Sequence, residues 1–187
     1  YAKGAPQKAG FFGHRMENFQ NEVKPFWVSE VNCKSSGSID VIEKALDYAR
    51  KLDARPKCIG VELAFIPADS AAALRKAFPD SQIKDALFVL ERLRAIKTPD
   101  ELKMLRIASD AVIDSMEAVI KNHGAGATKN ELVEALRREE TSRGLTFDYC
   151  LITAGSSLNR APSDQRWEDG DILSLDSGGN YHGYIGD

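Results

Sequence analysis

Two helix starts in the second half of the sequence carry the capping-box pattern. Thr98 and Glu101 flank a proline at the first helical position, and residues 128–131 repeat the Thr-x-x-Glu spacing. In this pattern each of the two side chains accepts a hydrogen bond from a backbone N–H that the first helical turn leaves free. Apolar residues then recur at helical spacing, namely Leu102, Leu105, Ala108, Val112, Met116 and Val119 in the first segment and Leu132, Ala135 and Leu136 in the second. We therefore expect helices over about 98–123 and about 128–143, each ended by glycine.

The pattern changes from helical to strand-like after the second of these helices. Residues 147–153 are rich in β-branched and aromatic residues. After an irregular loop, residues 171–176 and 184–187 read as two strands joined by a glycine-rich turn. Within 171–176, leucines alternate with Ser174 and Asp176, which places the leucines on one face of a sheet and the acid on the other. The second half of the chain therefore predicts an α+β arrangement.

The first half indicates a smaller α/β domain. Residues 1–37 are rich in glycine, proline and aromatic residues without a sustained period, so we expect loops and one short strand around 26–31. A helix then begins at Ser38, which can cap it, and ends near Ala54. The remaining expected elements are a buried strand at 58–62, a helix over about 69–78 and a strand at 81–85. Alternation of strand and helix is typical of an α/β layer.

Bulk composition excludes several classes of protein. The 187 residues are 43% hydrophobic and 28% charged, which is an average globular composition. A net charge of −3 and scattered Lys and Arg residues give no basic stripe for nucleic acid. No apolar run approaches the roughly 20 residues that cross a bilayer, and the first residues lack a signal-peptide pattern. We expect a cytoplasmic protein that binds neither nucleic acid nor membrane.

The cysteines and histidines give little indication of a site. Cys33, Cys58 and Cys150 are odd in number and far apart, which favours buried free thiols. His14 and His123 are interpreted as structural, and His182 lies in the expected turn, where a ligand role is the minor alternative. The tyrosines at 149 and 184 are candidates for lining a substrate pocket, although packing is the commoner role of tyrosine.

Asp176 and Asp187 form the candidate site. If the turn of the hairpin is Tyr181-His182, paired positions place Asp176 directly opposite Asp187. Opposed carboxylates destabilise a sheet, and a divalent cation is the simplest compensation. On this spacing alone, two unrelated acids at strand ends remain the favoured interpretation. The wider sequence context changes that balance.

Three segments resemble the pita-bread metallopeptidases. Residues 175–187 resemble their Asp-x-Gly, Tyr-x-Gly-Tyr and second Asp, with the same interval between the acids. Residues 93–108 resemble the segment that opens their catalytic domain, and Gly170-Asp171 matches their usual Gly-Asp. The resemblance implies an N-terminal creatinase- or prolidase-like α/β domain over 1–90 and the first part of an α+β pita-bread catalytic domain over 91–187.

The resemblance also implies the chemistry. Asp176 would bind one of two divalent ions and Asp187 would bridge both, with a His and two Glu supplied beyond residue 187. Carboxylates suit hard ions, so Mn²⁺ is expected, with Co²⁺ or Zn²⁺ as alternatives. The implied reaction is hydrolysis of a peptide bond next to proline by a metal-activated water, in a homodimer. The missing initiator Met and the strand-like last residues predict a piece of a longer protein. That piece is expected to be inactive alone and to bind metal weakly, with its general base and substrate residues unassigned.

One departure from the family pattern leaves alternatives open. Peptidases of this family carry a His in the loop before the Gly-Asp, whereas residues 154–163 contain none. Asn159 or Arg160 takes roughly that place and offers a hydrogen bond, but neither shuttles a proton near pH 7 as His does. Two other functions therefore stay open: a creatinase-like hydrolase of a small metabolite, and a pita-bread binding module without catalysis.

Overall fold

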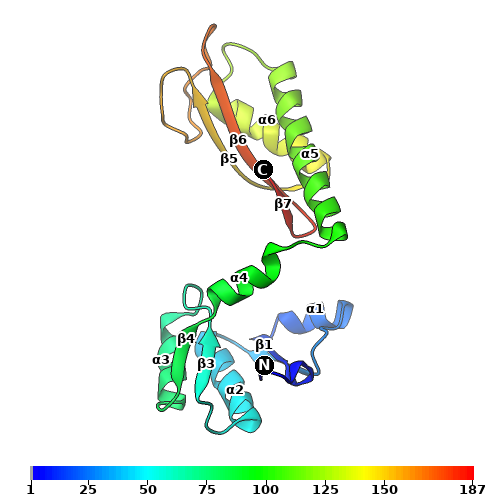
Figure 1. The fold of residues 1–187 in the computed structure, drawn as a ribbon. Helices are drawn as coiled ribbons and strands as arrows, with labels where there is room; N and C mark the ends of the chain where they lie inside the picture. The colour runs from blue at the N-terminus through cyan, green and yellow to red at the C-terminus, as the bar shows by residue number, and fades with distance from the viewer. Residues whose placement is uncertain (1) are drawn as a thin grey trace. The chain divides into compact units, whose positions relative to one another are not determined.

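The computed structural model describes residues 2–187 and divides them into two compact units. The first unit ends at Ala95, and the second runs from Ile96 to Asp187 (Figure 1). The boundary expected from the sequence, after residue 90, falls inside helix α4 (Leu87–Ala95). Each unit has its own hydrophobic core. In the described residues, no helix is both long and apolar enough to cross a membrane.

The first unit is an α/β arrangement with two parallel strand pairs. Its elements before α4 are η1 (Pro6–Lys8), β1 (Gly10–His14), α1 (Glu17–Val23), β2 (Glu30–Ser35), α2 (Ser38–Leu52), β3 (Cys58–Val61), α3 (Ala68–Ala77) and β4 (Gln82–Asp85). Strand β1 pairs with β2, and β3 pairs with β4. Parallel strands need a crossover, and α1 and α3 lie in the two crossovers. Leu46, Leu74 and Phe78 form the buried core under α2 and α3.

Several details of the first unit differ from the sequence-based expectation. Residues 1–37 contain two strands and a helix instead of loops and one strand at 26–31. These elements are only five to seven residues long, so no period marks them, and the parallel pairing that stabilises β1 and β2 is not visible locally. Ser38 does not cap α2: Gly37 holds the cap position, and the Ser38 hydroxyl donates to Asp69 in α3 at 2.6 Å. Helix α4 was not expected.

Strand β3 was expected to be buried, and this was wrong. Its side chains alternate between exposed and half-buried because β3 pairs only with β4 in a two-stranded sheet covered on one face. Cys58 is accordingly exposed, whereas Cys33 and Cys150 are buried free thiols as expected.

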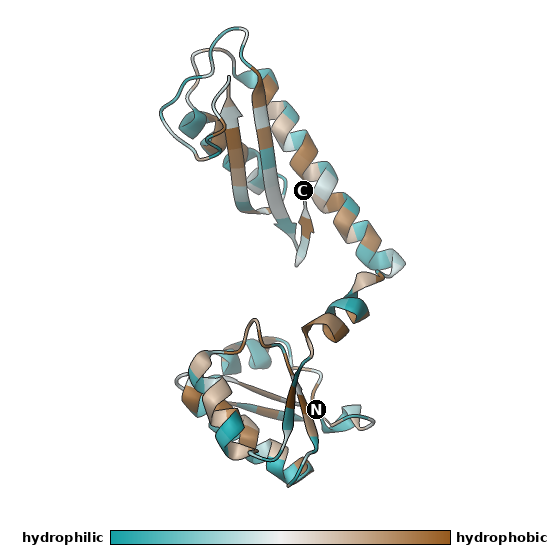
Figure 2. Cartoon of the chain, turned by 60° about the vertical axis from the view of Figure 1, so that its left-hand side comes forward, coloured by the Kyte–Doolittle hydropathy of each residue, from teal (hydrophilic) through white to brown (hydrophobic). Residues whose placement is uncertain are grey.

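The second unit packs two helices on one side of an antiparallel sheet. Its elements are α5 (Pro99–Asn122), α6 (Lys129–Ser142), β5 (Thr146–Ala154), β6 (Leu173–Tyr181) and β7 (Tyr184–Gly186), with strand order β5-β6-β7. Both expected capping boxes form, with Thr98 and Thr128 as the capping residues. Hydrophobic and hydrophilic residues alternate along α5 (Figure 2). Leu132, Leu136 and Ile152 are fully buried in the largest part of the core.

Strand β7 lies against α5 backbone to backbone. A Cβ atom added at Gly186 would lie 2.3 Å from the carbonyl carbon of Ala108 and 2.4 Å from the backbone nitrogen of Ser109. No side chain fits in that space, and Ala108 itself is fully buried. Because Asp187 directly follows Gly186, this contact fixes where the second candidate acid leaves the sheet.

We predict that Gly186→Ala destabilises the second unit by about 1–3 kcal/mol or more, because the added methyl group forces α5 and β7 apart. Denaturant unfolding followed by Trp167 fluorescence in a Trp27→Phe background measures the change, since Trp167 lies in the second unit. Gly124→Ala is the matched control, because a Cβ at Gly124 meets nothing within 4 Å and its φ is not in the left-handed region. Equal stability of the two variants would contradict the prediction.

Candidate functional site

The two faces of β6 separate the core from the candidate acids. Leu173 and Leu175 pack into the core beneath the helices. Asp176 alternates with them and lies on the opposite face, where its side chain is 37% exposed. The alternation read from the sequence is therefore confirmed, and the candidate acid lies on the face that the helices leave open.

The register of the hairpin differs from the expectation by two residues. Tyr181 pairs with Tyr184, so the turn residues are His182 and Gly183 instead of Tyr181 and His182. Both have positive φ, 52° and 93°, as a two-residue type I′ turn requires. Glycine adopts such a φ without strain, whereas a bulky Tyr181 would be strained there. The glycine therefore belongs inside the turn, and this selects the register.

Asp176 and Asp187 are consequently not directly opposite each other, and this part of the expectation was wrong. Asp176 pairs with Leu151 of β5, and the β6–β7 register continues to place Asp187 opposite Gly178. A shift of two residues keeps side chains on the same face, whereas a shift of one would reverse them. The two acids are thus diagonal neighbours on the open face, a relation that typically separates positions by about 7–8 Å.

Tyr149 lies between the two acids. It pairs with Gly178, and its ring fills the space of the missing side chain: a Cβ at Gly178 would lie 2.4 Å from Tyr149 Cε1. Partial burial raises the pKa of the Tyr149 phenol, and the charge of Asp187, a hydrogen bond to Asp187 and the charge of Asp176 raise it further. Arg160 acts in the opposite direction. One phenol is therefore within the influence of both carboxylates.

Tyr184 lies elsewhere. It pairs with Tyr181, which packs against the helix-side core around Ala108, and its hydroxyl is 3.5 Å from Glu101 Oε1. Of the two tyrosines considered as pocket residues, only Tyr149 is beside the candidate acids.

Arg160 is the cation of this face. Its guanidinium donates to Asp176 Oδ2 from the loop between β5 and β6. The side chain of Asn159, the other residue considered for this place, instead accepts from the backbone N–H of Ala161 at 3.0 Å. Arg160 carries a fixed charge and donates hydrogen bonds but does not exchange a proton near neutral pH.

A buried lysine that the sequence did not single out holds this loop in place. Lys129 is fully buried, and its ammonium donates to the Asn159 carbonyl at 2.7 Å. The backbone N–H of Ile152 donates to the Arg160 carbonyl at 2.9 Å. These two hydrogen bonds fix the carbonyl groups before and after the Arg160 Cα atom, and so they fix the backbone that carries the Arg160 guanidinium. Nothing in the local sequence marks Lys129, because a lysine in the first turn of a helix is ordinarily solvated.

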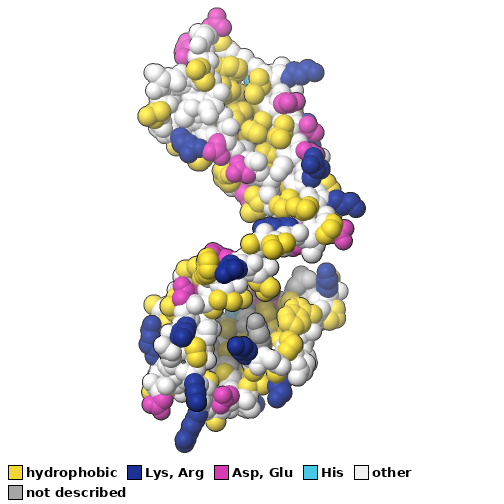
Figure 3. All heavy atoms as spheres, in the orientation of Figure 1, with side chains coloured by type: hydrophobic (Ala, Val, Ile, Leu, Met, Phe, Trp, Pro, Cys, Tyr) yellow, Lys and Arg dark blue, Asp and Glu magenta, His cyan; other side chains and the backbone are white. Residues whose placement is uncertain are grey.

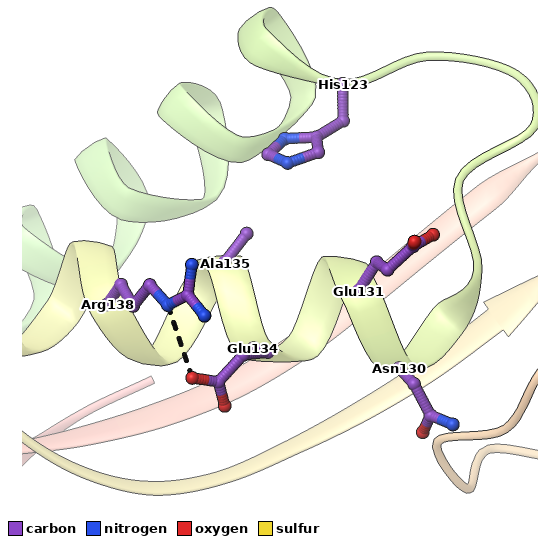
Figure 4. A pocket seen from close by; sticks show the side chains of 6 residues that line it. All are labelled: His123, Asn130, Glu131, Glu134, Ala135 and Arg138. Atoms are coloured by element: carbon purple, nitrogen blue, oxygen red, sulfur yellow. Dashed lines mark hydrogen bonds and ion pairs between the residues drawn. The ribbon is translucent and has the colours of Figure 1, made fainter.

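A hollow lies between the end of α5 and α6, away from the acids. It encloses about 550 Å³ and is lined by His123, Asn130, Glu131, Glu134, Ala135 and Arg138 (Figure 4). His123 Nδ1 is 2.9 Å from the Val119 carbonyl, and Glu134 pairs with Arg138, so these groups already have partners.

His182, in the turn between β6 and β7, makes an edge contact with the Tyr181 ring at 4.5 Å between ring centroids. These contacts agree with structural roles for both histidines.

Charged groups elsewhere form no comparable arrangement. On the face drawn in Figure 3, Lys and Arg side chains are dispersed among Asp and Glu. Among residues 2–187, no group of three or more His, Cys, Asp and Glu side chains is placed to hold a metal ion. Asp176 and Asp187 are thus a pair of carboxylates, with Arg160 and Tyr149 as their polar neighbours.

Comparison with known proteins agrees with this part of the fold. Residues 103–187 match the model of metallopeptidase family M24. An uncharacterized peptidase, YqhT of Bacillus subtilis (strain 168), is 29% identical over 138 residues, which is 70% of this chain and 38% of that protein.

Solved structures match almost the whole chain. An X-Pro aminopeptidase from Thermotoga maritima MSB8 aligns with a TM-score of 0.76 at 18% identity, over 94% of this chain and 49% of that one. An Xaa-Pro dipeptidase from Bacillus anthracis aligns with a TM-score of 0.76 at 22% identity, over 92% of this chain and 48% of that one. The chain thus spans about half the length of these solved relatives, and at this identity the likeness shows the fold. Residues 103–187 are thus similar to metallopeptidase family M24, and the chain has a partial α/β pita-bread fold.

Proposed function

We propose that the protein is a metal-dependent hydrolase in which Asp176 and Asp187 bind divalent ions. The observation that carries this proposal is the placement of the two carboxylates as diagonal neighbours on the open face of the sheet, within the segment that matches family M24. Neighbouring like charges are unfavourable without compensation, and Arg160 supplies one positive charge for the two carboxylates. Carboxylate oxygens suit hard divalent ions, so the two aspartates fit a site for such ions.

The two aspartates supply only part of a complete metal site. By the family resemblance, Asp176 would help to hold one ion and Asp187 would help to hold both, together with a His and two Glu ligands. Mn²⁺ is the proposed ion, with Co²⁺ or Zn²⁺ as alternatives. Divalent ions bound there would supply Lewis-acid activation of water and of the scissile carbonyl. We also propose, from the family resemblance, that the protein forms a homodimer.

The neighbours of the acids orient them. Arg160 donates to Asp176, and the Tyr149 phenol donates to Asp187, so each carboxylate is held from one side by a hydrogen bond. The open face of the sheet leaves the other side accessible. We assign Tyr149 the role of positioning Asp187, whereas Arg160 pairs with an Asp176 oxygen that an ion would otherwise bind.

The proposed substrate is a peptide with proline after the scissile bond. Two of the matching solved proteins are named as an X-Pro aminopeptidase and an Xaa-Pro dipeptidase, which supports this choice. A second candidate is hydrolysis of a small amide or amidine metabolite. It is favoured by one observation: Arg160, not a histidine, contacts Asp176 from the loop before the Gly-Asp.

We predict that the chain binds Mn²⁺ with a dissociation constant on the order of 10⁻⁴ M or weaker, because few carboxylates hold the ion. Asp176→Asn and Asp187→Asn should each weaken binding by roughly tenfold or more, since each removes one of two charges. Titration followed by electron paramagnetic resonance of free Mn²⁺ measures this. Asp169→Asn, an exposed acid outside the pair, is the control. Unchanged affinity in both site variants would refute the assignment of the ligands.

We predict that Arg160→Gln strengthens Mn²⁺ binding about two- to fivefold, because the guanidinium competes with the ion for Asp176 and an exposed pair of this kind is worth at most about 1 kcal/mol. The same titration tests it. Arg138→Gln removes an equal charge from an exposed site on α6 and serves as the control. Weaker binding in Arg160→Gln would show that Arg160 supports the ion instead of competing with it.

The substrate is tested by measuring turnover with the full-length protein. With Mn²⁺ present, we expect hydrolysis of Xaa-Pro dipeptides or of peptides with proline second, and a loss of about 100-fold or more in kcat/KM in Asp176→Asn, equivalent to about 2.7 kcal/mol. Activity on small amides or amidines without peptide cleavage would select the second candidate. Inactivity on both panels by a metal-loaded protein would rule out both.

A further inference from the structure

A buried carboxyl group lies behind the strand that carries Asp176. Glu140, on α6, is fully buried, and its Oε1 is 2.7 Å from the hydroxyl oxygen of Ser177 on β6. Its other oxygen, Oε2, has no hydrogen-bond partner among residues 2–187. It lies toward Gly179, where a Cβ would approach it to 2.9 Å. An ionised carboxylate in this environment would carry charge on an oxygen that no donor stabilises.

The Ser177 hydroxyl has two neighbours but a single proton. Its oxygen is 2.7 Å from Glu140 Oε1 and 2.8 Å from the carbonyl oxygen of Tyr149. A carbonyl oxygen only accepts, and an ionised carboxylate also only accepts. With Glu140 ionised, Ser177 would therefore satisfy one neighbour and place lone pairs against the other at hydrogen-bond distance.

We infer that Glu140 is protonated at neutral pH and donates to Ser177, whose hydroxyl donates to the Tyr149 carbonyl. Every short contact in this chain then has one proton, and the unpartnered Oε2 is a neutral carbonyl oxygen, which costs less to bury than a charged one. The three groups come from α6, β6 and β5, so the chain of hydrogen bonds ties one helix to two strands on the core side of the sheet.

The electrostatic surroundings agree with a protonated Glu140. Burial raises the pKa of Glu140, the contact with Ser177 lowers it, and the negative charge of Asp148 raises it. The other titratable neighbour is Cys150, whose pKa burial raises to about 11, so that thiol is neutral at pH 7. Neither of these neighbours, both on β5, is a cation that would favour the ionised form.

This arrangement makes Glu140 a positioning residue for the candidate acids. Ser177 directly follows Asp176, and Tyr149 lies over Gly178 between Asp176 and Asp187. The hydrogen bonds therefore hold β6 at Ser177, next to Asp176, and β5 at Tyr149, whose ring lies on the open face. This role rests on the proposed metal function, whereas the protonation of Glu140 does not.

The protonation is tested on the whole chain by infrared difference spectroscopy between wild type and Glu140→Gln at neutral pH. We expect the carbonyl stretch of a protonated carboxylic acid in the wild type and its loss in the variant. Carboxylate bands in its place would overturn the inference. Glu134→Gln, which replaces an exposed acid of the same helix, should show carboxylate bands only.

Stability against pH gives a second measurement. If the pKa of Glu140 in the folded state lies above its unfolded value, ionisation of Glu140 does not destabilise the wild type below the ordinary pKa of glutamate. The wild type then loses stability as pH rises through the folded-state pKa of Glu140. Glu140→Gln keeps a donor for Ser177 and cannot ionise. The Tm of the wild type should therefore fall relative to the Tm of Glu140→Gln as pH rises. A difference independent of pH would overturn the inference.

Hydrogen exchange of β5 and β6 tests the positioning role. Ser177→Ala and Glu140→Leu should lose protection in these strands, while Glu140→Gln, which retains a donor, should keep it. Equal loss in Glu140→Gln and Glu140→Leu would overturn the role. Far-ultraviolet circular dichroism identifies variants that fail to fold, and the infrared result depends on the folding of Glu140→Gln but not of Ser177→Ala or Glu140→Leu. If Asp176→Asn leaves Mn²⁺ binding unchanged, the metal proposal fails while the infrared and pH results still decide the state of Glu140.

Discussion

The backbone of β7 rests directly on the backbone of α5, and the site depends on this contact. Gly186 meets Ala108 and Ser109 without an intervening side chain, which allows a short strand to be held firmly at the edge of a sheet. Only three residues of β7 pair with β6, so the helix contact supplies what a longer ladder would otherwise provide. The residue that follows is Asp187, whose position is set by this packing and by the turn before it.

The sheet of the second unit separates two kinds of carboxyl group. Asp176 and Asp187 lie on the open face, where Arg160 and the Tyr149 phenol are their polar neighbours. Glu140 lies on the core face, where residues 2–187 place no cation beside it and where a neutral carboxyl group completes a hydrogen-bond chain. The two faces are joined through Ser177, which is adjacent to Asp176 in sequence and opposite to it in direction. Alternation along one strand thus couples a buried neutral group to an exposed charged one.

Local signals in the sequence determined the frame of the second unit. The capping boxes at Thr98 and Thr128 specify both helix starts, because the side chains that satisfy the first turn lie within four consecutive residues. Alternation of leucine with polar residues specified which face of β6 carries Asp176, and this holds for any partner strand. The first unit was less predictable, because the short strands β1 and β2 gain their stability from parallel pairing across a crossover.

The tertiary structure decided what depends on contacts between distant residues. The sequence by itself placed Asp176 and Asp187 on one face, since every even shift of register preserves that face. It did not determine that they are diagonal, because the turn was selected by the positive φ of Gly183. The pairing of Arg160 with Asp176 requires a loop held by Lys129, thirty residues earlier than the carbonyl it binds. Glu140 reads in the sequence as one more charged helix residue, and only packing against β6 removes it from water.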